Sequence, residues 1–419
     1  MCAVENTHDN MKNALIYIAV GICLLCYACT APQSQSKSRT DYLACATAIA
    51  RSEITHNPEL WMADFLTKPK WDYTQGLIAK AMLETYLATG DSAYLRYVQA
   101  FADFFIQENG SIQTYKLETY NLDRVNGGNF IFLLDSIDPQ PRYEAAIRLL
   151  RSQLLTQPRT REGGFWHKQI YPSQMWLDGL YMAEPFYAHY AIWAGEDSIF
   201  DDVVRQFRIV DKHTINPATG LNYHGWDESR AQAWADSLTG CSPHTWGRAE
   251  GWYAMAICDV LDYLPAEHDG RTDLINILRR VCAALLTYQD PHTKMWYQVP
   301  DMPDAEGNYT ESTCSAMFCY AMAKGARMGY LPKEYLTIAR EAFDGLWNSA
   351  VIQNEDGTLS LTRCCAVAGL GGNPYRSGTY DYYIHERVRN DDPKGIGPLI
   401  LAALELNKSK DIICPTIKP

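Results

Sequence analysis

Apolar residues recur along most of the chain at intervals of three and four positions, with polar residues between them. One example is the set Leu77, Met82, Leu83 and Tyr86. This spacing places the apolar side chains on one face of an α-helix. Connections rich in Gly, Pro, Asp and Asn separate such stretches, and the pattern predicts helices near residues 41–54, 73–89, 91–107, 141–155, 174–194, 199–211, 247–264, 271–288, 312–329, 333–349 and 394–407.

The order of these elements predicts the fold class. Strand-like alternation of apolar and polar residues is scarce, and no linker of domain-boundary character interrupts the chain after residue 40. We therefore predict one all-α domain over residues 41–419, in which two layers of paired helices could wind as a toroid. The periodicity alone does not separate a toroid from an α-solenoid.

One predicted helix contains a carboxylate among apolar neighbours. The stretch "YPSQMWLDGLYMAEPFYAHYA", residues 171–191, is almost wholly aromatic and aliphatic, yet it contains Asp178 and no Lys or Arg. Its first residues predict a helix start with Ser173 as the N-cap. A carboxylate in such surroundings must be hydrogen-bonded, change its pKa, or face a water-filled cavity.

Other polar residues lie in the connections, at or just inside predicted helix starts. "NLDRVNGGNF" contains Asp123, "EGGFWHKQIYPSQMWLD" contains His167, and "GLNYHGWD" contains His224. "HTWGRAEGWYAMAICDVLDYLP" contains Arg248 and Trp252, one helical turn apart and so on one face. If alternate helices start at one end of a barrel, these connections converge on one mouth, where binding groups gather.

Composition narrows the function. The net charge of −12 argues against nucleic acid as a partner, without selecting an acidic substrate. The 27 Tyr and 11 Trp suit a sugar-binding cleft, although each ring alone also fits core packing. The chain shows no P-loop, no Rossmann glycine fingerprint, and no Cys or His spacing typical of zinc sites. We therefore predict neither a metal nor a nucleotide or redox cofactor.

The 13 cysteines do not form an obvious disulfide framework. Four precede residue 30, and most of the others lie within apolar helical runs, which predicts that they are small core residues. The adjacent pair Cys364 and Cys365 has no explanation from the sequence.

The N-terminal segment predicts export. From Met11, "MKNALIYIAVGICLLCYACTAPQSQSKS" has a basic start, an apolar run too short for a membrane span, and a polar segment. Ala28-Cys29 is similar to a bacterial lipoprotein cleavage site, although Cys26 stands where Leu is usual. We predict a signal over residues 1–29, lipidation of Cys29 and a flexible tether over residues 30–40. The protein would then be a periplasmic or outer-membrane-anchored lipoprotein, touching the membrane only through its lipid; an ordinary signal peptide is the alternative.

Four long stretches resemble one family of enzymes. They are "MWLDGLYMAEPF", "HTWGRAEGWYAMAICDVLDYLP", "WYQVPDMPDAEGNYTESTCSAMFCYAMAKGAR" and "AVAGLGGNPYRSGTYDYYIHERVRNDDPKGIGPLILAALEL". In this order they resemble glycoside hydrolase family 105, the unsaturated rhamnogalacturonyl hydrolases, over most of residues 40–408. The resemblance implies an (α/α)6 barrel. It also implies an oligosaccharide substrate that carries the terminal unsaturated uronic acid left by polysaccharide lyases, with rhamnose as the usual next sugar.

The resemblance also implies a mechanism. An aspartic acid protonates the ring double bond between carbons 4 and 5, water adds at carbon 5, and the hemiketal collapses and releases the neighbouring sugar. Asp178 in "MWLD" matches this acid/base, and its aromatic surroundings should keep its pKa near the working pH. Asp123 matches a second carboxylate, which would raise the pKa of Asp178 and orient the water.

Further residues match side chains that bind the sugar. This set is Tyr73, His167, Trp176, His224, Arg248 and Trp252. Arg248 would hold sugar oxygens or the carboxylate, and Trp252 would stack on the sugar. The family pattern "RGNGW" reads "RAEGW" here, so that Glu250 replaces a neutral residue.

Three alternatives remain open at this point. The first is a family 88 enzyme with the same barrel and chemistry that acts on unsaturated glucuronyl oligosaccharides. The second is a non-catalytic sugar-binding lipoprotein, and the third is an (α/α)6 epimerase that exchanges protons through a histidine pair. Read singly, Asp178 could also be a helix-start aspartate and Asp123 a turn former.

Overall fold

The structure is a computed structural model that describes residues 40–412. The predicted signal, the tether and Cys29 lie outside these residues. Within the part of the chain that is described, no helix is both long and apolar enough to cross a membrane.

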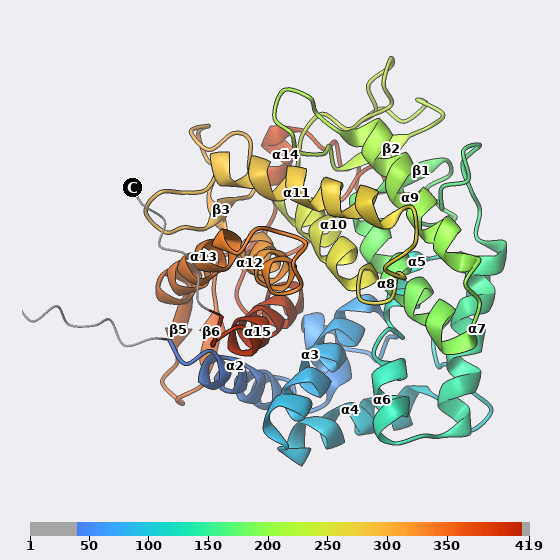
Figure 1. Cartoon of the computed structure of the whole chain (residues 1–419), viewed down its shortest axis with the longest axis vertical. Coiled ribbons are helices and arrows are strands. Elements are labelled where there is room, and N and C mark those ends of the chain that lie inside the picture. The colour runs from blue at the N-terminus through green and yellow to red at the C-terminus, as the bar shows by residue number, and fades with distance from the viewer. Residues whose placement is uncertain (1–39, 413–419) are drawn as a thin grey trace, which may run out of the picture. The chain divides into compact units, whose positions relative to one another are not determined.

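Inner helices form a closed ring (Figure 1). Each contacts the next, and the last packs against the first, so the ring closes between residues far apart in sequence. The inner helices are α3 (Tyr73–Thr89), α5 (Leu122–Asn126) followed by α6 (Ile131–Ile137), α8 (Leu177–Ala194), α10 (Gly247–Val260), α12 (Ser312–Arg327) and α15 (Pro393–Lys408).

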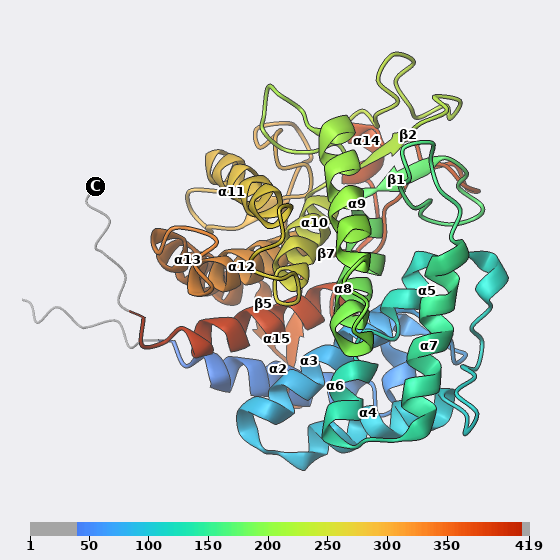
Figure 2. The same cartoon turned by 45° about the vertical axis from the view of Figure 1, so that its right-hand side comes forward.

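A second layer of helices packs outside this ring (Figures 1 and 2). These outer helices are α2 (Tyr42–His56), α4 (Ser92–Phe105), α7 (Pro141–Thr156), α9 (Ile199–Thr214), α11 (Arg271–Thr287) and α13 (Glu334–Ala350). Most outer helices follow the inner helix against which they pack, as α4 follows α3, α9 follows α8 and α13 follows α12. The predicted all-α toroid, an (α/α)6 barrel, is confirmed, and the closed ring excludes a solenoid.

The two layers differ in burial in the way their sequences predict. Every residue of α10 is buried, whereas α9 buries one face and exposes charged residues on the other. A helix that is covered on all sides tolerates an apolar composition throughout, and a surface helix needs an amphipathic one. The polar side chains that do occur on the inner helices are therefore the informative ones.

Several inner helices begin at capping carboxylates or amides. Asp72 caps α3, Asn121 caps α5, Glu311 caps α12 and Asp392 caps α15, each through a side-chain oxygen that accepts a backbone N–H. Such oxygens satisfy the free N–H groups of a helix start and are favoured by the helix dipole. Because these helices start at one end of the ring, acidic groups concentrate there.

The prediction that Ser173 is the N-cap of α8 is wrong. Ser173 has a φ of 63° and precedes a strand, β1 (Gln174–Trp176), which pairs antiparallel with β2 (Gly225–Asp227). The helix begins at Leu177, three residues after the predicted start at residue 174, and it has no side-chain cap. The N–H of Leu177 donates to the carbonyl of His224. Pairing with a segment far along the chain competes with local capping, and it fixes the start of α8 beside His224.

The remaining elements are short and lie in the connections. They are the 3-10 helices η1 (Leu60–Phe65) and η2 (Leu117–Thr119), the helix α14 (Tyr380–Ile384), and the strand pairs β3 (Trp296–Tyr297) with β4 (Thr310–Glu311), β5 (Val351–Gln353) with β6 (Leu359–Leu361), and β7 (Cys364–Cys365) with β8 (Val388–Arg389). In both views β1, β2 and α14 lie at the same end of the ring (Figures 1 and 2).

The cysteines of residues 40–412 are all buried and free, which confirms the prediction that they are small core residues. Strand β7 also explains the adjacent pair. The backbone of Cys365 donates to Glu311 Oε1 at 2.9 Å and accepts from Arg248 Nη1 at 2.6 Å. This segment therefore serves through its backbone, by satisfying two buried charged groups.

Candidate active site

A cavity of about 330 Å³ opens at the end of the ring where the inner helices begin. Residues at the starts of α3, α5, α8 and α15, together with the loops beside them, form its wall. Its charged lining consists of the cations Lys70, Lys168, Arg376, Arg389 and Lys394 and the anions Asp64, Asp72, Asp123 and Asp178. Of the sequence-predicted site residues, Tyr73, Asp123, His167, Trp176 and Asp178 all line this cavity, as the expected convergence on one mouth requires.

Asp178 lies in the first turn of α8, with a buried histidine behind it. Its Oδ2 is 3.0 Å from Nε2 of His224, and His224 Nδ1 is 2.7 Å from the hydroxyl of Tyr383. The Asp178–His224 contact has the length of an ion pair, but the ring N–H is not aligned for a hydrogen bond, and both atoms are buried. Catalytic contacts of this kind are often poorly aligned before substrate binds.

The pKa of Asp178 differs from the sequence expectation. Burial alone would raise it, but the opposing effects of His224 and then His167 are larger together, and the pKa is lowered below its ordinary value. Burial also lowers the pKa of His224, so this ring is neutral at neutral pH. The prediction of a raised pKa was wrong because it considered the apolar surroundings and Asp123 but not the two histidines, which come from other segments.

Asp123 is held as an anion by two neighbours. Lys168 Nζ lies 2.5 Å from Asp123 Oδ2, and His167 Nε2 lies 3.4 Å from Oδ1. Burial works to raise the pKa of Asp123, but Lys168 and His167 outweigh it and hold the pKa well below its usual range. The negative charge of Asp123 is therefore balanced locally, and the expectation that it raises the pKa of Asp178 is not met.

Aromatic rings form one wall of the cavity. The ring of Trp176 lies between His167 and Tyr171, with centroid distances of 4.7 and 4.8 Å and nearly parallel planes. The guanidinium of Arg376 lies 5.7 Å from the centroid of Trp176 and donates to the Tyr171 hydroxyl at 2.7 Å. This stack fixes the side chains that flank the two carboxylates.

Arg248 and Trp252 do not line the cavity. Each side chain is 1% exposed. Trp252 stacks on Tyr181 at 4.6 Å and meets the edge of Tyr73 at 6.1 Å, so it supports a cavity-lining residue from beneath. In this structure its position differs from the one that direct stacking on a sugar would need, because the inner helix α10 is covered on every side.

Glu250 of "RAEGW" faces away from both residues of that pair. It accepts the backbone N–H of Asn222 at 3.2 Å, and burial raises its pKa to about 8. The departure from the family pattern therefore changes the packing between α10 and the outer layer, and it does not alter the polarity of the cavity.

Most charged residues of the cavity wall were not predicted from the sequence, among them Lys168 and Arg376, and neither was Tyr383. Lys168 directly follows His167 in "FWHK", which is the one local signal that could have identified it. Arg376 and Tyr383 lie in "YRSGTYDYY", a stretch that contributed to the resemblance without assigned roles. Across residues 40–412, no group of three or more His, Cys, Asp or Glu is placed to hold a metal ion.

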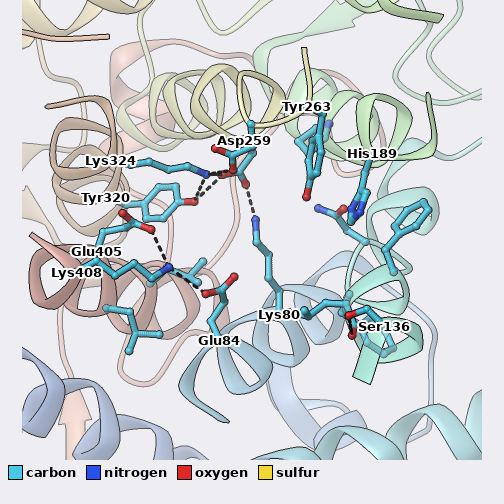
Figure 3. Close-up of a pocket in the computed structure, with 18 of the residues that line it drawn as sticks. Lys80, Glu84, Ser136, His189, Asp259, Tyr263, Tyr320, Lys324, Glu405 and Lys408 are labelled. Atoms are coloured by element: carbon cyan, nitrogen blue, oxygen red, sulfur yellow. Dashed lines mark hydrogen bonds and ion pairs between the residues drawn. The ribbon is translucent and has the colours of Figure 1, made fainter. Parts of the chain in front are cut away.

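A second cavity, of about 280 Å³, lies among the later turns of the inner helices (Figure 3). At its centre Asp259 contacts Lys80 at 2.5 Å and Lys324 at 2.7 Å, and it accepts from the Tyr320 hydroxyl at 2.6 Å. None of the residues around this cavity has a buried side-chain polar atom without a partner. Its charges satisfy one another, so the first cavity is the candidate active site.

Comparison with known proteins agrees with this geometry. Residues 45–410 match the family model described as Glycosyl Hydrolase Family 88. A solved glycoside hydrolase from family 105 of Clostridium acetobutylicum (C. acetobutylicum ATCC 824) is 43% identical, with a TM-score of 0.83 over 87% of this chain and 99% of that one.

Two curated proteins are also similar. Protein Atu3128 of Agrobacterium fabrum is 40% identical over 230 residues, which are 54% of this chain and 97% of that protein. The unsaturated rhamnogalacturonyl hydrolase YesR of Bacillus subtilis is 26% identical over 264 residues, 62% of this chain and 72% of YesR.

Proposed function

Because the chain belongs to Glycosyl Hydrolase Family 88, as the match over residues 45–410 shows, we propose a specific substrate and mechanism for it. The chain is a hydrolase of the family 88 and 105 type, which processes unsaturated uronic acids. The proposed substrate is a lyase product in which an unsaturated galacturonic acid precedes rhamnose, in line with the name of YesR. The proposed acid/base is Asp178.

One observation carries the assignment of Asp178. It is the carboxylate of the cavity that no Lys or Arg neutralises, since its close partner is the neutral ring of His224. Asp123, only a few residues into α5, is already paired with Lys168. A group that must accept and give a proton needs a partner that does not fix its charge, and among these two carboxylates Asp178 meets that condition.

The proposed reaction balances through this one carboxyl group. Asp178 gives its proton to carbon 4 of the double bond, and the positive charge that develops at carbon 5 is shared with the ring oxygen. A water molecule then adds to carbon 5 and passes a proton back to the Asp178 carboxylate. The resulting hemiketal collapses and releases the neighbouring sugar, so the net change is the addition of one water molecule.

The low pKa of Asp178 in the free protein has a consequence for this sequence of steps. A carboxylate substrate placed beside Asp178 disfavours a second negative charge and therefore raises the pKa of Asp178. The cavity lining has five Lys and Arg side chains against four Asp side chains, and this excess of positive charge offsets the charge of the substrate, as binding of a uronate requires. Substrate binding would thus bring in the proton that the first step consumes.

The competing substrate is an unsaturated glucuronyl oligosaccharide, which the description of the matching family model does not exclude. The test is a panel of lyase-generated disaccharides, followed by the loss of ultraviolet absorbance of the double bond. We expect turnover on the rhamnogalacturonan product and little on glycosaminoglycan products. The reverse order would reassign the substrate, and turnover on none of them would overturn the proposal in favour of a binding protein.

For the location of the protein we propose lipidation at Cys29 and anchoring outside the cytoplasmic membrane. Support comes from the short apolar run that ends at Ala28-Cys29 and from the polar tether after it. Mass spectrometry of the mature N-terminus tests this. Cleavage elsewhere, with an unmodified Cys29, would leave an ordinary secreted protein.

A further inference from the structure

Behind Asp178 and His224 stands a third buried group, Tyr383 of α14. Its hydroxyl lies 2.7 Å from His224 Nδ1, and its ring is fully buried. The ring stacks on Trp246 with a centroid distance of 5.9 Å and an interplanar angle of 10°, and its carbonyl accepts from Gln298 Nε2 at 3.0 Å. The hydroxyl is therefore held in place by packing on one side and by its backbone on the other.

The hydrogen-bond partners available to the Tyr383 hydroxyl determine which group is the donor in its contact with His224. Burial raises the pKa of Tyr383 well above its ordinary value, so the side chain is a phenol that must place its O–H. Within residues 40–412 the only hydrogen bond of this hydroxyl is the one to His224 Nδ1. If Nδ1 carried a hydrogen, the phenol hydrogen would be buried without an acceptor, which is unfavourable. Tyr383 therefore donates, Nδ1 accepts, and the ring hydrogen of His224 is on Nε2.

From this arrangement we propose that Tyr383 is a positioning residue: by fixing His224 as the Nε2–H tautomer, it directs the catalytic proton of Asp178 onto Oδ1. The argument rests on the proposed role of Asp178. Nε2 lies 3.0 Å from Oδ2, so with a hydrogen already on Nε2 a second hydrogen on Oδ2 would be crowded against it, although the N–H is not aligned for a hydrogen bond. The proton must then be carried by Oδ1, the oxygen that His224 does not occupy.

The other groups around His224 keep its ring neutral, which the proposal requires. Asp178 of α8 is the one anion that faces it, and it favours a charged ring. Arg376, His167 and above all burial oppose that charge, and the pKa of His224 is lowered. A neutral imidazole carries one hydrogen, on either Nδ1 or Nε2. The hydrogen bond from the Tyr383 hydroxyl to Nδ1 places it on Nε2.

The first experiment reads the tautomer directly and needs no activity. Long-range proton–nitrogen NMR spectra of histidine-labelled protein, assigned with a His224→Gln variant, show which ring nitrogen is protonated. We expect Nε2–H in the wild-type protein and a shift towards Nδ1–H in Tyr383→Phe, which keeps the ring but lacks the hydroxyl. A wild-type His224 protonated on Nδ1 overturns the proposal, whatever the substrate proves to be.

The second experiment measures turnover. Tyr383→Phe should lower kcat about tenfold or more, because the tautomer that orients Asp178 is no longer enforced, and should leave KM within about twofold. In a His224→Gln background the same change should have no further effect, since the ring that transmits it is gone. Unchanged kcat with a shifted tautomer would overturn the link to catalysis and leave the proposed function intact.

Tyr253→Phe is the matched control for both experiments. Tyr253 is fully buried, and its hydroxyl makes one side-chain hydrogen bond, to Asp211 at 3.3 Å, away from the cavity. Removing this hydroxyl should change the melting temperature about as much as Tyr383→Phe does, with no change in kcat or in the His224 spectrum. If both variants lower kcat equally, the effect is one of packing and Tyr383 has no positioning role.

Discussion

The two ends of the helical ring use charge in opposite ways. At the mouth, the buried atoms Asp178 Oδ2 and His224 Nε2 lie 3.0 Å apart without a hydrogen bond, and Asp178 pairs with no Lys or Arg. At the other end, Asp259 is saturated by Lys80, Lys324 and a tyrosine hydroxyl (Figure 3). Both cavities are polar and similar in volume. Incomplete pairing of buried groups, and not polarity, distinguishes the end to which we assign the proposed chemistry.

Helix polarity explains part of this contrast. Acidic caps such as Asp72 and Asp392 lie at the starts of the inner helices, and basic residues such as Lys324 and Lys408 lie in their last turns. Both placements are favoured by the helix dipole. The second end is therefore stabilised by charges that match its helices, whereas Asp178 is favoured by its helix and disfavoured by burial.

The largest effect is expected for Asp178→Asn. The amide keeps the shape of the side chain but can neither give a proton to carbon nor take one from water. General acid/base groups contribute about 100- to 10,000-fold, and this group serves two steps, so kcat should fall at least about a thousandfold. Steady-state kinetics with the unsaturated disaccharide measure this. More than a tenth of wild-type turnover would move the acid role to Asp123.

Asp259→Asn should do the reverse and act on stability alone. Removing the anion leaves Lys80 without its ion-pair partner and the buried Lys324 with Asp262 alone, which should cost about 3–5 kcal/mol in the free energy of unfolding. The folded fraction should keep kcat within about twofold, because the site is distant. Urea titration and kinetics of the same sample test both parts. A large loss of kcat in folded protein would mean that the two ends are coupled.

Asp262→Asn is the control for this change. Asp262 is 33% exposed and pairs only with Lys324, so its loss should cost about 1 kcal/mol or less.

The contribution of Asp259 to the free energy of unfolding of the wild-type protein also depends on pH. Its folded pKa is lowered, so the stabilisation is present above the ordinary pKa of an aspartate and is lost as the pH falls below about 4. In Asp259→Asn, the free energy of unfolding should therefore decrease less steeply as the pH falls below about 4.

The pH profile of the wild-type enzyme offers a third test. The profile of kcat/KM reports the free protein, in which the pKa of Asp178 is lowered, so it should fall with rising pH by about tenfold per unit from pH 4 upwards. The profile of kcat reports the complex, in which a bound carboxylate raises that pKa, and it should stay level to a higher pH. Coincident profiles would show that substrate does not change the protonation of Asp178.

The smallest effect is expected at the rim of the second cavity. Lys408 is 41% exposed and pairs with Glu84 and Glu405, and Glu405 keeps a second partner in Arg327. Lys408→Ala should therefore lower the free energy of unfolding by about 0.2–1 kcal/mol and leave kcat and KM unchanged. Thermal denaturation and kinetics measure this. A rise in KM for the disaccharide would indicate that the second cavity also handles substrate.

The sequence predicted the helices well because their signal is local. Helix α3 was predicted over residues 73–89 and runs from Tyr73 to Thr89, with an acidic cap at one end and Gly90 at the other. The short helices α5, α6 and α14 were missed, since five to seven residues carry too little periodicity to be recognised. Ser173 was misplaced because β1 pairs with a strand that lies far along the chain.

The candidate site was predictable in its members but not in its electrostatics. Asp178, Asp123 and His167 could be named from motifs and do line one cavity. Their pKa values could not be predicted, because the groups that set them come from distant segments, as with His224 beside Asp178. Trp252 was assigned to substrate contact from the resemblance of "RAEGW" to a family motif, yet every residue of α10 is buried.

Closure of the ring by α15 affects how the protein is made as well as how it works. Synthesis proceeds from the N-terminus, so α2 and α3 are made long before α15, the helix against which both pack. Until about residue 408 leaves the ribosome, the inner surface of α3 lacks one of its two flanking helices. Contacts between the two ends of a sequence are slow to form and expose apolar surface meanwhile. We therefore expect the apolar surface of α3 that α15 covers to stay exposed in the nascent chain until α15 has been made.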